Sequence, residues 1–338
     1  MKKLIVLPNT PRSPSPTRVR HLLNAMPERE ALYFERINRR DMLSEDAARP
    51  GLTIKTLPDA RLFRSARHAA FVRKTARALR FTDPVLWVCS PLHAETARRI
   101  PRSALIFDAS EGYHEKLAAA ADVILVSTAV QEARAKLSGK PVRLLPNGVS
   151  FSMYHEAAER NLPFPDDLFN VRNPIIGHLG ALDRDVDLGY IEAAAKARPD
   201  WSFVFVGAVS GADVTPLKDL PNVFLLGHKP HKTLPVYVSR FDVCVNVTKN
   251  VDASPMKLYA YLATGKPVVS TPHPAQALDY TEALYIAATH EEFIALCQKA
   301  LRERDAWRVR RRIEYGRAAS WEARVLELER LMKELSVF

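Results

Sequence analysis

Residues 174–207, PIIGHLGALDRDVDLGYIEAAAKARPDWSFVFVG, decide the fold. This stretch begins and ends with a short apolar run, and a helix-like segment, DLGYIEAAAK, lies between the two runs. Uninterrupted apolar runs of about four to eight residues are typical of strands buried on both faces of a parallel sheet. A strand, a helix and a second strand in this order predict one repeat of a doubly wound α/β domain.

The same alternation runs through the rest of the chain. Further strand-like runs are KLIVLP (3–8), ALYFER (31–36), LTIKTL (52–57), VLWVCS (85–90), ALIFDA (104–109), DVILVS (122–127), VRLLPN (142–147), VFLLG (223–227), VCVNV (243–247) and PVVST (267–271). They predict two successive Rossmann-like domains with parallel sheets, which face a central cleft at the carboxyl ends of their strands, where such sheets bind ligands.

The expected domain boundaries follow from changes in composition. We expect an N-terminal, acceptor-binding domain over residues 1–150 and a C-terminal, nucleotide-sugar-binding domain over residues 151–317. Residues 161–174 are rich in Pro, Asp and Asn, which is typical of a linker. A helix over 318–338 should complete the N-terminal domain, because its apolar residues recur on one face.

The excess positive charge is confined to the first half of the chain. The 338 residues carry a net charge of +11, and residues 1–150 hold 26 Lys and Arg against 14 Asp and Glu. This asymmetry indicates a polyanionic partner for that half, and an acidic substrate, an anionic membrane surface and nucleic acid all fit it, as does a merely soluble basic surface. The chain lacks the interleaved aromatic and basic residues of many nucleic-acid-binding proteins, so we expect no nucleic-acid partner.

Other features point to a cytoplasmic protein. Cys89, Cys244 and Cys297 are far apart in the sequence, as expected of reduced, buried thiols, and their spacing does not suggest zinc. No run of about 18 apolar residues exists, and the apolar start, Leu4 to Leu7, is too short for a signal peptide.

Residues 252–271, DASPMKLYAYLATGKPVVST, carry the clearest chemical signal. Ser254 is a good helix N-cap and Pro255 is a preferred first helical residue, so a helix should begin here. The amides of its first turn form an anion site, and Lys257 there would neutralise a bound diphosphate. A plain capped helix with a solvated lysine is the alternative. Gly180 and Gly207 end two strands where a ligand could approach the backbone.

The runs LPNVFLLGHKPHKTLPVYVSRFDVCVNV and SPMKLYAYLATGKPVVST resemble the donor-binding half of GT-B glycosyltransferases of bacterial surface-polysaccharide biosynthesis. The resemblance extends to teichuronic-acid-type glycosyltransferases and to the xanthan glucuronosyltransferase. It implies that Met256 and Lys257 contact UDP and that the loop containing His228 and Pro230 holds the base. Many GT-B enzymes carry two glutamates eight residues apart, where this chain has Asp252 and Ala260. The glucuronosyltransferase, which inverts, also lacks the second glutamate, which favours inversion.

An inverting transferase needs a general base for the acceptor hydroxyl. Asp108 and Glu111 follow a buried strand, and related enzymes carry an acidic pair there, so Glu111 is the stronger candidate and His114 the next. A helix-initiating acidic cluster is the alternative. Arg18 and His21 match an Arg-x-x-His pattern of teichuronic-type relatives, and we assign them to the acceptor side.

Two further segments have more than one interpretation. DRDVD at 183–187 looks like a metal-binding motif of another fold, but Asp187 is better placed to cap a helix, so we expect no metal. RLFRSARHAAFVRKTARALR, residues 61–80, has seven basic residues and no acid. It predicts either a membrane-surface helix, in which Arg64, Arg67, Arg73 and Arg77 contact lipid headgroups, or an ordinary helix with a solvated basic face.

These observations together predict a metal-independent glycosyltransferase without a cofactor. It would move a sugar, which the resemblance to the xanthan enzyme implies is glucuronic acid, from a UDP-sugar to a lipid-linked saccharide during exopolysaccharide or cell-surface glycan assembly. It would act as a peripheral protein on the inner, anionic face of the bacterial membrane, with no obligate protein partner. A nucleotide-sugar epimerase of the same architecture and a non-enzymatic nucleic-acid-binding protein are the alternative functions.

Overall fold

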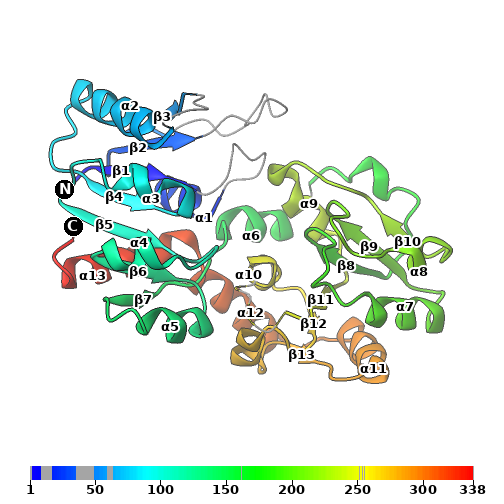
Figure 1. Ribbon diagram of the computed structural model, residues 1–338. Helices are drawn as coiled ribbons and strands as arrows, with labels where there is room; N and C mark the ends of the chain where they lie inside the picture. The colour runs from blue at the N-terminus through cyan, green and yellow to red at the C-terminus, as the bar shows by residue number, and fades with distance from the viewer. Residues whose placement is uncertain are drawn as a thin grey trace. The chain divides into compact units, whose positions relative to one another are not determined.

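The computed structural model describes residues 2–8, 17–35, 49–58, 64–160, 162–250, 252, 254 and 256–337. The chain divides into two compact units (Figure 1). Unit 1 comprises Met1–Asn147 and Trp321–Phe338, and unit 2 comprises Gly148–Ser320. The sequence had placed the same transitions near residues 150 and 318.

Unit 1 is built on a seven-stranded parallel sheet with the order β3-β2-β1-β4-β5-β6-β7. In its register, Leu4 lies opposite Ala31 on one side and Val85 on the other. The strands are β1 (Leu4–Leu7), β2 (Ala31–Glu35), β3 (Leu52–Thr56), β4 (Val85–Val88), β5 (Ala104–Asp108), β6 (Val123–Val126) and β7 (Val142–Leu144). All seven correspond to apolar runs predicted from the sequence.

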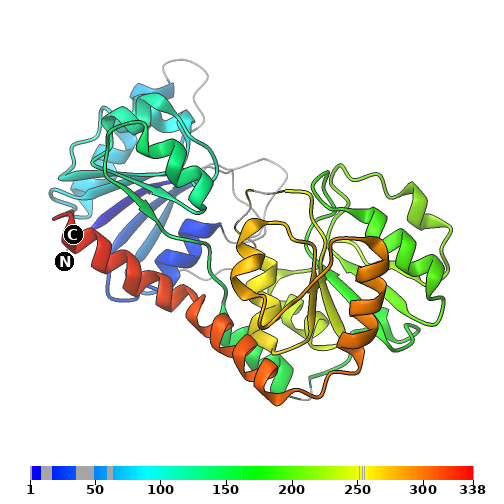
Figure 2. The same ribbon diagram turned by 90° about the horizontal axis from the view of Figure 1, so that it is seen from below.

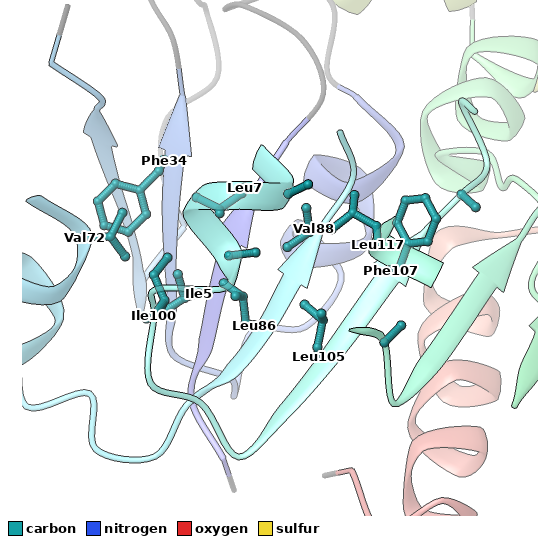
Figure 3. Close-up of a cluster of buried hydrophobic side chains, with 14 of the residues drawn as sticks. Ile5, Leu7, Phe34, Val72, Leu86, Val88, Ile100, Leu105, Phe107 and Leu117 are labelled. Atoms are coloured by element: carbon teal, nitrogen blue, oxygen red, sulfur yellow. The ribbon is translucent and has the colours of Figure 1, made fainter. Parts of the chain in front are cut away.

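Each face of this sheet is covered by its own apolar core. Ile5 and Leu7 face a cluster that includes Phe34, Val72 and Phe107 (Figure 3). The alternate residues of β1 face the opposite cluster, which includes side chains of two helices, α1 and α13. The helices of unit 1 are α1 (Arg18–Asn24), α2 (Arg64–Ala78), the 3-10 helix η1 (Pro91–His93), α3 (Ala94–Ala97), α4 (Glu115–Ala120), α5 (Ala129–Lys136) and α13 (Trp321–Glu334).

The C-terminal helix α13 packs along the unit 1 sheet (Figure 2). Val325 and Leu328 are buried in the cluster beside Trp87, and Leu331 and Leu335 pack against it. This apolar spacing keeps one stripe of the helix out of water, so burial of the stripe holds the end of the chain on unit 1.

Unit 2 has a six-stranded parallel sheet with the order β10-β9-β8-β11-β12-β13. Its strands are β8 (Ile175–Leu179), β9 (Ser202–Val206), β10 (Val223–Leu225), β11 (Val243–Asn246), β12 (Val268–Ser270) and β13 (Tyr285–Ile286). Its helices are α6 (Phe151–Glu159), α7 (Leu188–Ala197), α8 (Thr215–Lys218), α9 (Leu234–Ser239), α10 (Met256–Thr264), α11 (His290–Leu301) and α12 (Ala306–Ala318), with the 3-10 helices η2 (Asp166–Leu168), η3 (His231–Thr233) and η4 (Ala275–Tyr280). Two parallel, helix-covered sheets confirm the predicted α/β architecture.

Two local predictions were wrong. The expected linker at 161–174 packs into unit 2 over its described part, because Leu168 is fully buried and Val171 nearly so. The basic helix predicted over 61–80 ends earlier than expected, because α2 ends at Ala78 and Leu79 is 41% exposed. Within the described residues, none of the helices combines the length and apolar character needed to cross a membrane.

Candidate functional site in unit 2

The first turn of α10 lies beside the end of β8. After β8 the chain turns at Gly180, whose φ of 116° favours glycine. A Cβ placed on Gly180 would come within 3.9 Å of the Cδ atom of Lys257. The hydroxyl of Tyr261, one helical turn further along α10, accepts a hydrogen bond from the Leu179 N–H at 2.7 Å. This buried bond fixes the start of α10 against the end of β8.

Lys257 places a positive charge at this edge of the sheet. Its side chain is half-buried, and within the described residues no hydrogen bond or ion pair forms at its ammonium group. Burial lowers the pKa of Lys257 to about 8, although the nearby carboxylates of Asp183 and Asp185 favour the charged form. A bound anion here would stabilise the charged form of the Lys257 side chain.

The sequence analysis missed His178, which lies in β8 two residues before the turn at Gly180. Its side chain is fully buried in β8, and among the described residues no hydrogen bond of good geometry reaches either ring nitrogen. Burial and the Lys257 ammonium hold its pKa well below the usual value, against the backbone of Val245, which favours the protonated ring. A histidine inside an apolar strand such as PIIGHLG is the sequence signal that could have identified it.

Gly207 has a structural role, contrary to the prediction that it makes room for a ligand. A Cβ at this position would lie 2.0 Å from the carbonyl oxygen of Gly180. The two loops that follow β8 and β9 therefore pass so closely that only glycine fits. Of the predicted glycine pair, Gly180 is the one beside Lys257.

Carboxylates of the acidic loop at 183–187 accept hydrogen bonds from backbone N–H groups and from a side-chain amide. Asp187 caps α7 by accepting a hydrogen bond from the Gly189 N–H, which confirms the prediction for this residue. The Asp185 carboxylate accepts a hydrogen bond from the Asn250 side chain at 2.7 Å. Among the described residues, no three His, Cys, Asp or Glu side chains gather as metal ligands.

The other predicted donor-binding residues lie at the start of α10, in the segment before it and in the loop before η3. The Asp252 N–H donates to the Asn250 side chain, and the Met256 N–H donates to the Ser254 carbonyl oxygen. The predicted contact at Pro255 lies outside the described residues. His228 and Pro230 are exposed in the loop between β10 and η3.

The acidic pair of unit 1 is divided between a buried and an exposed residue. Asp108, at the end of β5, is 2% exposed and forms an ion pair with the Arg18 Nε atom at 3.3 Å. Arg18 also donates to the Asn147 side chain and to the Leu145 carbonyl oxygen. Its assignment to the acceptor side was wrong in this respect, because these bonds hold α1 against β5 and the segment after β7.

Glu111 is exposed and lies close enough to Cys89 to act on it electrostatically. Burial, with the carboxylates of Asp108 and Glu111, holds the pKa of the Cys89 thiol well above its usual value, so this thiol stays neutral. His114 caps α4, with its Nδ1 atom accepting from the Leu117 N–H. The geometry therefore leaves Glu111 as the better candidate base.

The remaining predicted residues differ in exposure. His21 is buried and stacks on Trp321 with 4.9 Å between ring centroids, so it does not face an acceptor or a membrane. The arginines predicted to contact a membrane all lie exposed on α2, namely Arg64, Arg67, Arg73 and Arg77. The three cysteines are buried and form no disulfide.

Comparisons with known proteins agree with this architecture. Residues 173–303 match the family described as glycosyl transferases group 1. The chain is 31% identical over 170 residues to TuaH, a teichuronic acid biosynthesis glycosyltransferase of Bacillus subtilis (strain 168). That alignment covers 47% of this chain and 42% of TuaH, so the chain spans about two fifths of the length of this curated relative.

Solved structures resemble the chain over nearly its whole length. The trehalose-6-phosphate synthase OtsA superposes with a TM-score of 0.71 at 14% identity, covering 100% of this chain and 99% of OtsA. HepE of Anabaena, solved with UDP-glucose, superposes with a TM-score of 0.68 at 15% identity, covering 100% of each chain. At these identities the likeness establishes the fold, which confirms the resemblance inferred from the sequence. The chain has the GT-B fold, and its residues 173–303 are similar to the group 1 glycosyl transferases.

Proposed function

We propose that the chain is a glycosyltransferase that moves a sugar from a UDP-sugar to a lipid-linked saccharide during assembly of a bacterial surface glycan. The observation that carries the proposal is the half-buried Lys257 in the first turn of α10, within the segment that matches the group 1 family; no described residue forms an ion pair with its ammonium group. The UDP-glucose complex of HepE and the role in TuaH's name support the donor and the pathway.

Lys257 would neutralise the diphosphate of the donor. Its ammonium and the amides at the start of α10 are both positive, and the turn at Gly180 lacks a side chain that would obstruct a ligand there. Asp183 and Asp185 reduce the cost of burying this charge. Met256, 37% exposed beside Lys257, would contact the nucleotide, and the loop with His228 and Pro230 would hold the base.

Glu111 would act as the general base for the acceptor. The acceptor hydroxyl oxygen forms the new bond to the anomeric carbon, its proton passes to the Glu111 carboxylate, and UDP leaves with the electrons of the broken bond. Asp108 would serve as a positioning residue, since Arg18 already holds its carboxylate. Inversion of configuration follows from this single displacement. The group proposed for transfer is glucuronic acid, and neither a metal nor a cofactor takes part in the proposed step.

The exposed arginines of α2 would bring the protein to the inner face of the membrane. Arg64, Arg67, Arg73 and Arg77 lie along one helix, where each basic residue contributes about 1 kcal/mol of attraction to an anionic surface. Binding to anionic vesicles should weaken as salt rises, because this attraction is screened over about 8–10 Å at physiological ionic strength. Neutral vesicles serve as the control. If the wild-type protein does not bind anionic vesicles at low salt, this membrane contact is excluded.

A transfer assay tests the activity. The purified chain is incubated with radiolabelled UDP-glucuronic acid and other UDP-sugars, with and without a bacterial lipid extract. We expect the extract to stimulate UDP release and the label to move into the lipid phase. Recovery of the radiolabel in a different UDP-sugar would identify an epimerase. Absence of both reactions, with binding to nucleic acid, would support the non-enzymatic alternative.

A further inference from the structure

Unit 1 contains a cavity of about 410 Å³ at the amino ends of β4 and β5. Its apolar lining includes Ile5, Ala76, Phe81 and Ile100. Figure 3 places Ile5 beside Ile100 on the face of the sheet that α2 covers. The volume falls in the range of about 300–1,000 Å³ that is common for small-molecule sites, and an apolar lining of this size favours a hydrocarbon ligand.

The rim of this cavity is basic. Arg73, Arg77 and Arg80 line it, together with a single carboxylate, that of Asp83. Arg73 donates a hydrogen bond to the Arg99 carbonyl oxygen. Over the described part of the chain, Arg77 and Arg80 form no ion pair, and both side chains are exposed. Guanidinium groups of this kind suit phosphate, which they bind through several hydrogen bonds.

The loop between α2 and β4 holds an uncommon backbone. Arg80 has a φ of 56° and Asp83 a φ of 49°, in the left-handed region that residues other than glycine seldom adopt. Such residues persist only when the surroundings enforce them, and they are concentrated at functional sites. Both of these residues line the cavity.

The cavity is separate from the proposed acceptor edge. Asp108 and Glu111 follow the carboxyl end of β5, whereas Ile100 precedes the amino end of the same strand. Five residues of β5 span about 13 Å at roughly 3.3 Å per residue. A molecule in the cavity would therefore not be positioned by Asp108 or Glu111.

We propose that this cavity binds an anionic membrane lipid, with one acyl chain in the apolar interior and the phosphate headgroup at Arg73, Arg77 and Arg80. The apolar interior argues against a free inorganic anion, and the excess of three cations over one carboxylate argues against a neutral lipid. The inference rests on the membrane contact proposed for α2. It adds a defined lipid site to what would otherwise be general attraction by charge.

Dodecyl phosphate, used below its critical micelle concentration, tests the site by calorimetry on the full chain. Inorganic phosphate supplies the headgroup alone, and dodecyl maltoside supplies the same chain with a neutral head. We expect dodecyl phosphate to bind at least tenfold more tightly than either. Equal affinity for dodecyl phosphate and inorganic phosphate would overturn the proposal, because the dodecyl group would then contribute nothing to binding.

Substitutions locate the binding. Thr82→Trp places a large ring at the exposed rim and should weaken dodecyl phosphate binding more than tenfold. Arg77→Gln should weaken it about three- to fivefold, the range for an exposed charge pair. The matched control, Arg67→Gln, removes the same charge from α2 outside the cavity lining and should have little effect. Unchanged binding in Thr82→Trp, or equal losses in the two arginine variants, would contradict a defined site.

Two measurements separate the possible failures. Thermal unfolding checks that Thr82→Trp folds, and Pro101→Trp blocks the cavity from its other rim if it does not. Vesicle binding without dodecyl phosphate binding would remove the cavity but leave the proposed membrane contact intact. If neither vesicles nor dodecyl phosphate bind, both the membrane contact and the lipid site are excluded. Either result would leave the proposed UDP site in unit 2 untouched.

Discussion

The affinity for UDP should fall as pH rises through the pKa of Lys257. Burial lowers this pKa from 10.5 to about 8, with Asp183 and Asp185 opposing the shift. At pH 7 the ammonium is mostly charged, and at pH 9 it is mostly neutral. A bound diphosphate favours the charged form and raises the pKa of the lysine in the complex. Binding is therefore strongest below about pH 8 and weakens above it.

The size of the change follows from the titration. With a pKa of about 8, the charged fraction of Lys257 falls from about nine tenths at pH 7 to about one tenth at pH 9. If UDP binds only to the charged form, its association constant falls about tenfold, which corresponds to about 1.4 kcal/mol. Removing the charge at pH 7 by Lys257→Met should cost about 1.5–3 kcal/mol, the range for a hydrogen bond to a charged group.

Calorimetric titration of UDP at pH 7, 8 and 9, at constant ionic strength, measures this effect. Lys257→Arg is the matched control, because a guanidinium stays charged over this range. The UDP affinity of the Lys257→Arg variant should change with pH only because UDP itself and other groups titrate. Equal pH dependence in wild type and Lys257→Arg would refute the reasoning, as would a wild-type affinity that is the same at pH 7 and pH 9.

The folding stability of the protein should rise with pH over the range in which its UDP affinity falls. The folded-state pKa of Lys257 is below its unfolded value, so the unfolded chain binds more protons between about pH 8 and 10.5. The charged lysine therefore costs stability below about pH 8, and the cost declines as pH rises to 10.5. Lys257→Met should unfold at a higher temperature than wild type at pH 7, and the difference should shrink at higher pH. A lower unfolding temperature for the variant at pH 7 would contradict a destabilising ammonium.

Three further substitutions test the geometry. Glu111→Gln should reduce turnover about 10²–10⁴-fold with unchanged UDP affinity, and near-normal turnover would exclude it as the base. Asp108→Asn should lower the free energy of unfolding by about 3 kcal/mol, because a buried arginine loses its counter-ion; unchanged denaturant unfolding would mean that the pair contributes nothing. Gly207→Ala should lower the unfolding temperature, since its Cβ would meet a backbone oxygen at 2.0 Å. Gly189→Ala is the milder control, because its Cβ would have no atom closer than 3.4 Å, and equal effects of the two substitutions would contradict the close approach at Gly207.

The sheets could be predicted because their strands are buried on both faces. Twelve strands correspond to apolar runs visible in the sequence, and β13 (Tyr285–Ile286) was missed because two residues form no pattern. The return of α13 to unit 1 is consistent with the apolar stripe of that helix. The end of α2 was misplaced by two residues, because the apolar Leu79 gives no sign in the sequence that the helix ends at Ala78.

The roles of charged residues were harder to predict because they depend on partners distant in the sequence. Arg18 and Asp108 are 90 residues apart, so only the folded sheet reveals their ion pair. Gly207 resembled a ligand-binding glycine until its closeness to Gly180 was known. Lys257 was identified because its position conflicts with a local rule, namely that a cation is unfavourable in the first turn of a helix.

The two units treat buried polar groups differently at the carboxyl ends of their strands. In unit 1, Arg18 and Asp108 satisfy one another, so removing either leaves a buried charge without compensation. In unit 2, burial lowers the pKa of both Lys257 and His178, the Lys257 ammonium lowers that of His178 further, and among the described residues neither side chain forms an ion pair. Burial of these groups costs stability, and a bound, doubly charged phosphate group would offset that cost by attracting the lysine. Local rules are broken most often where function requires it, so the unsatisfied edge of unit 2 is the better candidate for the donor site.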